Sequence, residues 1–140
     1  MMSAVSKLYA RIVSMQLRLD GMDDAFAYFR NVSTPLVRDQ PGSLGILGAG
    51  NRETGSAWAI SFWSSAEDLE RSNGNPQVVA AMTGYAQWMT GPFVVASYDV
   101  ASGSPPSPAT TARWLRTTTM LPLPAHFDET IANVRERLAE

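Results

Sequence analysis

Two apolar segments joined by a short polar one, with helix signals on either side, are the feature that most constrains this chain. Residues 44–47 and 57–63 predict two strands, and residues 48–55 between them predict a hairpin. A Pro-Gly pair at 41–42 ends the helix signal that comes before, and Ser-Ser-Ala-Glu at 64–67 matches a capping box that starts the next helix. This order predicts an architecture but no reaction, because the segment contains no nucleophile, metal cluster or phosphate loop.

The flanking residues complete the order of elements. Residues 8–19 predict a first strand, and residues 22–36 predict a helix in which Pro35 causes a kink or a break. A longer helix begins at Pro76, and residues 93–100 predict a fourth strand. The expected apolar rows of the two helices are Met22, Phe26, Phe29, Val32 and Leu36, and Val78, Met82, Tyr85 and Met89. The order indicates an α+β, ferredoxin-like βαββαβ domain with an antiparallel sheet.

The chain is predicted to divide into a domain, a linker and an extension. Residues 1–101 form the ferredoxin-like domain, and residues 102–109 are a linker rich in Pro, Ser and Gly. Residues 110–140 predict a C-terminal strand-helix extension, with the strand at 110–121 and the helix at 126–139. Such a unit cannot bury its apolar face alone, so it docks on its own domain or is swapped onto a partner subunit; the long linker favours the swap.

Composition excludes several classes of partner. The absence of cysteine removes disulfides and Cys-ligated metal sites and fits a reducing cytoplasm. The 11 basic and 13 acidic residues are spread along the chain, so no patch suits nucleic acid or an anionic membrane. The first residues lack the apolar run of a signal peptide, and no stretch is long enough to span a membrane. We expect a cytoplasmic protein without a metal site that binds neither nucleic acid nor membrane.

The strand pattern predicts that the protein pairs with a second copy of itself. In residues 58–63 and 93–98 both alternating sets of side chains are largely apolar, whereas a sheet with one solvated face alternates apolar with polar. Two helices can cover one face. If Trp58, Ile60 and Phe62 share the other face, it needs a partner's sheet or the extension. The pattern therefore predicts a homodimer.

Small side chains in the third strand mark a candidate pocket. If Ala57, Ala59 and Ser61 face the helices, they leave room for a flat ligand against an aromatic wall, although small residues also let helices dock closely. Tyr85 lies on an apolar helix row, where a core role is more common than a catalytic one. The predicted substrate-binding residues are Trp63, Ala59, Ser61, Met82 and Tyr85. No catalytic residue and no buried polar pair are identified.

Three ionisable residues have competing interpretations. Arg11 and Asp99 are charges on apolar strands, where an ion pair or a strand-end position is the usual explanation and a substrate-anchoring charge the rarer one. His126 is the only histidine and titrates near neutrality. Its place at the start of the last predicted helix favours a surface or capping role over that of a general base.

Residues 9–100 resemble the antibiotic biosynthesis monooxygenase family of dimeric α+β barrel proteins. The motifs that carry the resemblance are Pro-Gly-Ser-Leu-Gly at 41–45 and Phe-Trp-Ser-Ser-Ala-Glu-Asp at 62–68. The resemblance implies a homodimer in which two four-stranded sheets face each other as a barrel. It also implies a ligand pocket in each subunit between sheet and helices.

The resemblance also bears on chemistry. Trp63 matches a Trp that lines the pocket of quinone-forming members beside an Asn and a Tyr, but Ala59 and Leu69 occupy those two places. Haem-degrading members use a His in the second long helix, and residues 76–89 contain none, so haem binding of that kind is rejected. No cofactor is expected. The same scaffold serves several reactions, so it does not give the function.

Two classes of function follow. The first is a pocket for a small hydrophobic ligand, with cofactor-independent monooxygenation of an aromatic or polyketide-like compound as its chemistry. The second is a non-catalytic dimeric ligand-binding or interaction module. A polar pair inside the pocket would favour the first.

Overall fold

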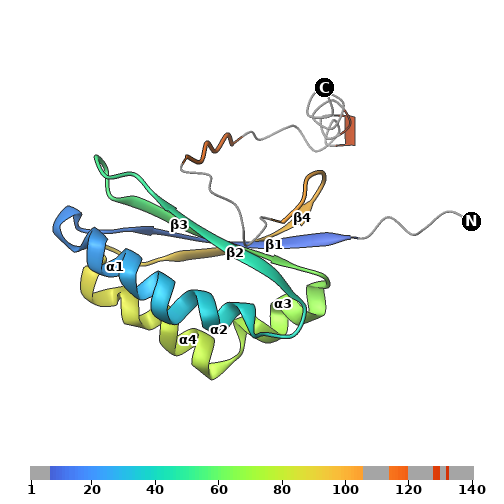
Figure 1. Cartoon of the computed structure of the whole chain (residues 1–140). Helices are drawn as coiled ribbons and strands as arrows, with labels where there is room; N and C mark the ends of the chain where they lie inside the picture. Colours follow the sequence, from blue (N-terminus) through green and yellow to red (C-terminus); the bar gives the residue numbers. More distant parts are fainter. Residues whose placement is uncertain (1–6, 106–113, 120–127, 130–131, 133–140) are drawn as a thin grey trace, which may run out of the picture.

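A computed structural model of the protein describes residues 7–105, 114–119, 128–129 and 132. The strands are β1 (Leu8–Gln16), β2 (Ser43–Gly50), β3 (Ser56–Trp63) and β4 (Val94–Val100), and the helices are α1 (Met22–Tyr28), α2 (Thr34–Arg38), α3 (Ala66–Asn73) and α4 (Pro76–Thr83). Shorter helical turns are η1 (Leu19–Gly21), η2 (Phe29–Ser33) and η3 (Gly84–Trp88). The strands form one antiparallel sheet in the order β2-β3-β1-β4, which confirms the predicted ferredoxin-like α+β domain (Figure 1).

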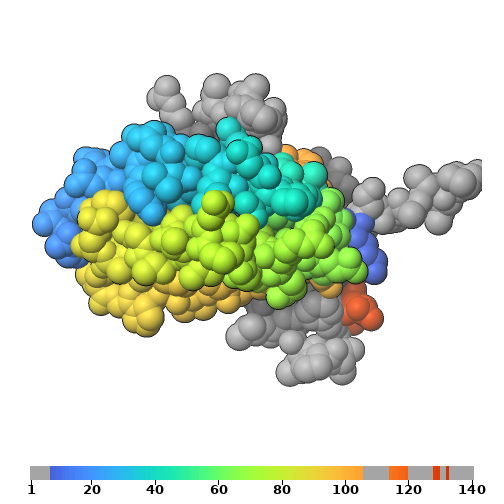
Figure 2. All heavy atoms as spheres, turned by 90° about the horizontal axis from the view of Figure 1, so that it is seen from below, coloured from blue at the N-terminus to red at the C-terminus, as the bar shows by residue number. Residues whose placement is uncertain are grey.

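All four α-helices lie on one face of the sheet (Figure 1). Seen from that side, the segment from α1 to α2 and the segment containing α4 run side by side and hide most of the sheet (Figure 2). The strand register places Arg11 beside Ser61 and Val13 beside Ala59, so these four side chains share a face. Ser61 and Val13 are buried, which identifies this face as the one under the helices.

The other face of the sheet carries apolar side chains that the helices α1 to α4 do not cover (Figure 1). Trp58, Ile60 and Phe62 alternate with the helix-facing residues of β3, so they share this second face as expected. On the edge strand β4, Val94 and Tyr98 belong to the same face and are exposed. The homodimer that would cover this surface is not part of the structure and stays a prediction.

The first long helix is interrupted by a π-helical turn, η2, directly before Pro35. The Thr34 amide donates to the Phe29 carbonyl, one residue further back than in an α-helix. The predicted break at Pro35 is therefore confirmed. The wider turn also rotates the chain, so Ser33 is buried while Val32 is 41% exposed, and the placement of Val32 in the apolar row was wrong.

The starts of the next two helices follow their capping residues. The N-cap of α3 is Ser65, whose Oγ accepts from the Asp68 amide and donates to the Asp68 carboxylate. The capping box therefore begins one residue later than predicted. Pro76 is the first residue of α4, as expected, and the Asn75 side chain caps that helix by accepting from the Gln77 amide.

The helix after Pro76 is shorter than its apolar row predicted. It ends as an α-helix at Thr83 and tightens into the 3-10 turn η3. The Tyr28 hydroxyl occupies the space where a side chain on Gly84 would begin, so the chain approaches the first helix closely at this glycine. The hairpin loop is also shorter than predicted, because Phe29 and Phe26 pack on Gly48 and Gly50, which makes these glycines part of β2.

Little of the C-terminal extension belongs to the described residues. Residues 114–119 have no regular secondary structure, so the strand predicted at 110–121 was wrong over this part. A strand needs a neighbour for its backbone hydrogen bonds, and within the described part of the chain β4 is the last strand of the sheet. Residues 128, 129 and 132 are helical, in agreement with the predicted helix. His126 and the remaining residues of the extension lie outside the described residues. The predicted swap of the extension onto a partner subunit therefore stays a prediction.

Candidate small-molecule site

A cavity of about 40 Å³ lies between the helix-facing side of the sheet and the segments η2, α2 and α4. The side chains that carry the argument below are Arg11, Val13 and Met15 from β1, Ala59 and Ser61 from β3, Phe29 and Ser33 from η2, and Ala81, Met82 and Tyr85 from α4 and η3. The space is far below the roughly 300 Å³ of a usual ligand pocket. An aromatic ring would therefore enter only if flexible lining groups such as Met82 moved aside.

The structure brings four of the five predicted site residues together at this cavity. Ala59, Ser61, Met82 and Tyr85 all line it. The small side chains of β3 leave the space that the helices do not fill. This agrees with the expectation that Ala59 and Ser61 face the helices. A ligand-binding role for these residues is still a prediction.

Trp63 lies beside the cavity and does not line it. Its side chain is completely buried against Val37 and Leu69. The indole Nε1 donates to the Ser61 Oγ over 2.9 Å, and Ser61 does line the cavity. Trp63 therefore holds the Ser61 hydroxyl in place and leaves its proton available to an acceptor in the cavity.

A buried polar pair, which sequence analysis did not identify, lies in the cavity wall. The hydroxyl oxygens of Ser33 and Tyr85 are 2.7 Å apart. Burial raises the pKa of Tyr85 to about 12, so this phenol is protonated at neutral pH. Ser33 follows Phe29 by four residues, and this helical spacing was the signal that could have placed it on the buried face.

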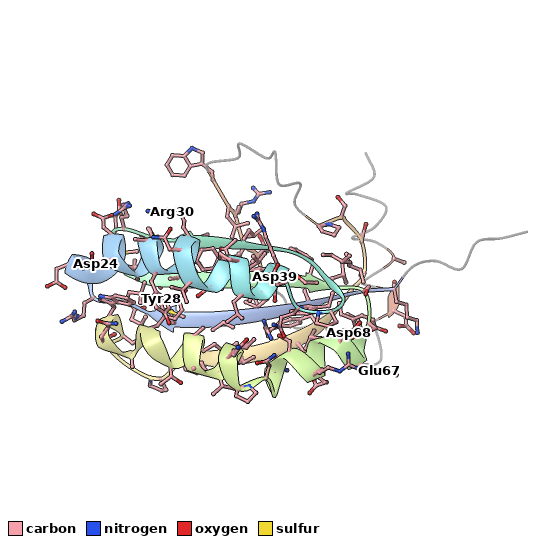
Figure 3. The ribbon with its side chains drawn as sticks, turned by 60° about the horizontal axis from the view of Figure 1, so that its bottom comes forward. Asp24, Tyr28, Arg30, Asp39, Glu67 and Asp68 are labelled. Carbon is pink, nitrogen blue, oxygen red and sulfur yellow. The ribbon has the colours of Figure 1, made fainter. Side chains whose placement is uncertain are left out.

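The aromatic surroundings of Tyr85 fix its ring. Tyr28 and Trp88 meet it edge to face, with ring centroids 4.8 and 6.1 Å away. Tyr28 lies between the first helix and the η3 segment (Figure 3), and its hydroxyl donates to the Ala81 carbonyl over 3.0 Å. Tyr85 is thus a core residue that also presents a polar group to the cavity, which combines the two interpretations considered from sequence.

Arg11 is the charged residue of the cavity wall and is only 2% exposed. Its Nη1 donates to the Ser72 Oγ over 3.0 Å and to the Asn73 Oδ1 over 2.9 Å, and its guanidinium lies 5.1 Å from the Trp63 ring centroid. Burial lowers its pKa to about 10, which leaves it charged at pH 7. Asp99 is exposed, and neither it nor any other described carboxylate forms an ion pair with Arg11, so among these residues the usual explanation of a paired charge does not hold for Arg11.

The polar side chains of the cavity wall are Arg11, Ser33, Ser61 and Tyr85, and each carries an N–H or O–H group at neutral pH. One of the two hydroxyl protons of Ser33 and Tyr85 is used in the hydrogen bond between them. No carboxylate or histidine lines the cavity among the described residues. Figure 3 shows Asp24 at one end of the helix layer and Glu67 and Asp68 at the other. The wall can therefore hold an oxygen acceptor on an apolar molecule, but it contains no strong base.

The described residues contain neither a metal-binding cluster nor a membrane-spanning helix. Within the described ranges, no three His, Cys, Asp or Glu side chains are grouped closely enough to hold a metal ion. No helix in the same ranges is both long and apolar enough to cross a membrane.

Comparison with solved structures gives the same fold in proteins of very different sequence. Rv0793 from Mycobacterium tuberculosis aligns with a TM-score of 0.55 at 16% identity, over 74% of this chain and 99% of that protein. A protein of Nitrosomonas europaea, named as a candidate antibiotic biosynthesis monooxygenase, aligns with a TM-score of 0.59 at 13% identity, over 71% of this chain and 95% of its own.

A further structure, named antibiotic biosynthesis monooxygenase without a stated organism, aligns with a TM-score of 0.56 at 13% identity, over 66% of this chain and 97% of its own. No protein-family model matches the sequence, and no curated protein matches it. The resemblance to antibiotic biosynthesis monooxygenases is therefore confirmed, and at these identities it is a resemblance of fold.

Proposed function

We propose that this chain binds a small, flat, mostly apolar molecule in the cavity between sheet and helices. The observation that carries the proposal is an apolar cavity with four polar side chains in its wall, Arg11, Ser33, Ser61 and Tyr85. Ligand sites commonly combine apolar walls with a few placed polar groups.

The reaction that this wall suits best is cofactor-independent monooxygenation of an aromatic or polyketide-like compound. The substrate itself supplies all four electrons that reduce O₂: its CH₂ group becomes a carbonyl, and the second oxygen atom leaves as water. Names of proteins with the same fold support this chemistry. Because the wall contains no base among the described residues, the substrate must be acidic enough to ionise without one, and the donor groups would stabilise its oxygen anion.

Oxygen uptake tests this reaction directly. The purified protein is mixed with a panel of enolisable phenolic ketones, and O₂ consumption is compared with buffer alone, with product carbonyl measured by mass spectrometry in ¹⁸O₂. One labelled oxygen atom in the product, formed only with protein, is the expected result. Uncatalysed rates with every substrate would leave binding alone as the function.

Neighbouring alanines on α4 provide a matched pair of variants for the binding site. Ala81 is buried and lines the cavity, whereas Ala80 is exposed on the same helix. Ala81→Leu fills the space and should abolish ligand-dependent thermal stabilisation and any O₂ uptake. Ala80→Leu adds the same side chain on the outer surface and should change neither. Equal ligand responses in the two variants would contradict a ligand site in this cavity.

The second proposal is a non-catalytic homodimer that binds a small molecule or acts as an interaction module. It is supported by the lack of a base in the described cavity wall and by the apolar sheet face opposite the helices. Ligand-dependent stabilisation without turnover would favour this function. The dimer itself is common to both proposals.

A further inference from the structure

We infer that Arg11 anchors an anionic oxygen, so that the ligand of this cavity is an aromatic carboxylate or phenolate. The inference rests on the proposed ligand site and adds the charge of the ligand and the group that recognises it. The resemblance of fold does not require it, because it follows from the surroundings of one side chain.

The first observation is a buried cation without a buried anion. Arg11 is 2% exposed, and no carboxylate of the described residues lies within ion-pair distance of it. Where both partners belong to the described residues, the ion pairs of arginine involve Arg18, Arg52 and Arg71, all on the surface. A buried charge is costly unless it is paired, so an unpaired guanidinium in a cavity wall indicates that its partner is a ligand.

The second observation is the number of unused donors. A guanidinium has five N–H groups, and the two on Nη1 are directed to Ser72 and Asn73. The Arg11 hydrogen bonds to described residues both start from Nη1, which leaves Nε and Nη2 without one among these residues, and Arg11 is part of the cavity wall. This remaining pair of nitrogens forms the fork that binds two oxygens of a carboxylate side by side, or one phenolate oxygen.

A purely structural role explains only part of this arrangement. Ser72 and Asn73 lie in the last turn of α3, where a cation is favoured by the helix dipole. That role would be fulfilled by Nη1 alone. Burial of the whole group, with Trp63 stacked on it, holds the guanidinium in one orientation before any ligand binds, which lowers the entropic cost of binding.

The neighbouring groups fit an anion as well. In the β1–β3 register Arg11 lies opposite Ser61, whose oxygen already accepts from Trp63 and whose proton is therefore available. Tyr85 and Ser33 add neutral hydroxyls to the same wall. An anionic oxygen would thus meet donors and a positive charge, and the ring attached to it would meet Val13, Met15 and Ala59.

The test compares probes of equal shape and different charge. Binding of benzoate and benzamide, and of 4-nitrophenolate and 4-nitroanisole at pH 8, is measured by isothermal titration calorimetry. We expect at least one anion to bind tenfold or more tightly than its neutral counterpart. The carboxylate and phenolate pairs tell the two ligand types apart.

Variants then assign the preference to one residue. Arg11→Gln should remove the preference for the anion and leave weak binding of the neutral probe unchanged. Arg30→Gln removes an exposed positive charge and should preserve the preference. Arg11→Lys retains the charge without the fork and should keep part of the preference if Arg11→Gln does not fold.

The outcomes separate the inference from the function on which it rests. Equal affinity for the anionic and neutral probes in the unmodified protein would overturn the inference and keep the ligand site. An anion preference that survives in Arg11→Gln would also overturn it. If no probe binds, the proposed ligand site fails, and the inference fails with it.

Discussion

The hydroxyl groups of Ser33 and Tyr85 form a hydrogen bond of 2.7 Å across the helix layer, although 52 positions separate them in sequence. Ser33 ends the π-helical turn η2, and Tyr85 belongs to the 3-10 turn η3. Both residues therefore lie where the helical repeat departs from the α-helix. π-helical turns occur frequently at functional sites, and this one turns a hydroxyl toward the cavity.

Loss of either hydroxyl should destabilise the protein, and the two losses should not add. Ser33→Ala and Tyr85→Phe each break the same buried hydrogen bond, with an expected cost of about 1 kcal/mol or more because a polar partner is left buried. The double variant should lose less than the sum of the two, which urea unfolding of all four proteins would measure. Strictly additive losses would contradict a direct bond between these groups.

The raised pKa of Tyr85 predicts a loss of stability in alkaline solution. Its pKa is about 12 in the folded protein and near the ordinary value of 10.0 in the unfolded chain. The unfolded state therefore releases this proton first, so the stabilisation is complete below about pH 10 and is lost as the pH rises toward 12. Thermal unfolding between pH 9 and 12 should show a steeper decline for the unmodified protein than for Tyr85→Phe.

Tyr98→Phe is the matched control for this pH dependence, because Tyr98 is an exposed tyrosine on β4. Its replacement should leave the alkaline decline as steep as before. A decline that changes equally in the two variants would mean that tyrosines in general, and not Tyr85, cause it.

Trp63→Ala should cost about 3 to 5 kcal/mol of unfolding free energy, as removal of a large buried aromatic side chain does. Trp63 is completely buried and also positions Ser61 through its indole N–H. Trp63→Phe should recover much of the stability without restoring that hydrogen bond. If ligand affinity also falls in Trp63→Phe, the indole acts through Ser61; unchanged affinity would limit Trp63 to a packing role.

The apolar sheet face should be the dimer interface. Val94 on β4 is 62% exposed on this face, and Val79 on α4 is 47% exposed on the helix side. Val94→Glu places a charge in the proposed interface and should shift the protein toward monomer in sedimentation at micromolar concentration. Val79→Glu adds the same charge outside it and should leave the dimer unchanged. A folded monomer in the unmodified protein would rule out the dimer.

Much of the fold was predictable because its signals are local. Pro41 and Gly42, the apolar strands and Pro76 lie next to the boundaries that they determine, and the order of elements followed from them. Errors arose where a distant contact changed a local preference. Val32 is exposed because a π turn precedes Pro35, and the hairpin is short because Phe26 and Phe29 need glycines beneath them.

The site was predictable only in part for the same reason. The alternation of side chains along β3 identified Ala59 and Ser61. Alternate residues of a strand share a face, and this can be read from the sequence before the fold is known. It could not show that Trp63 lies beside the cavity and supports Ser61 from there, because that depends on how Val37 and Leu69 pack.

The sequence by itself determined the βαββαβ order, the helix boundaries at its prolines and the absence of cysteine chemistry, because these depend on single residues and their immediate neighbours. Only the tertiary structure decided that Arg11 is buried without a counter-ion among the described residues and that Ser33 meets Tyr85. A buried charge or a polar pair depends on which distant segments pack together, and several arrangements of helices on a sheet satisfy the same apolar pattern. The candidate chemistry of this protein therefore comes from contacts between segments, whereas its fold comes from the segments themselves.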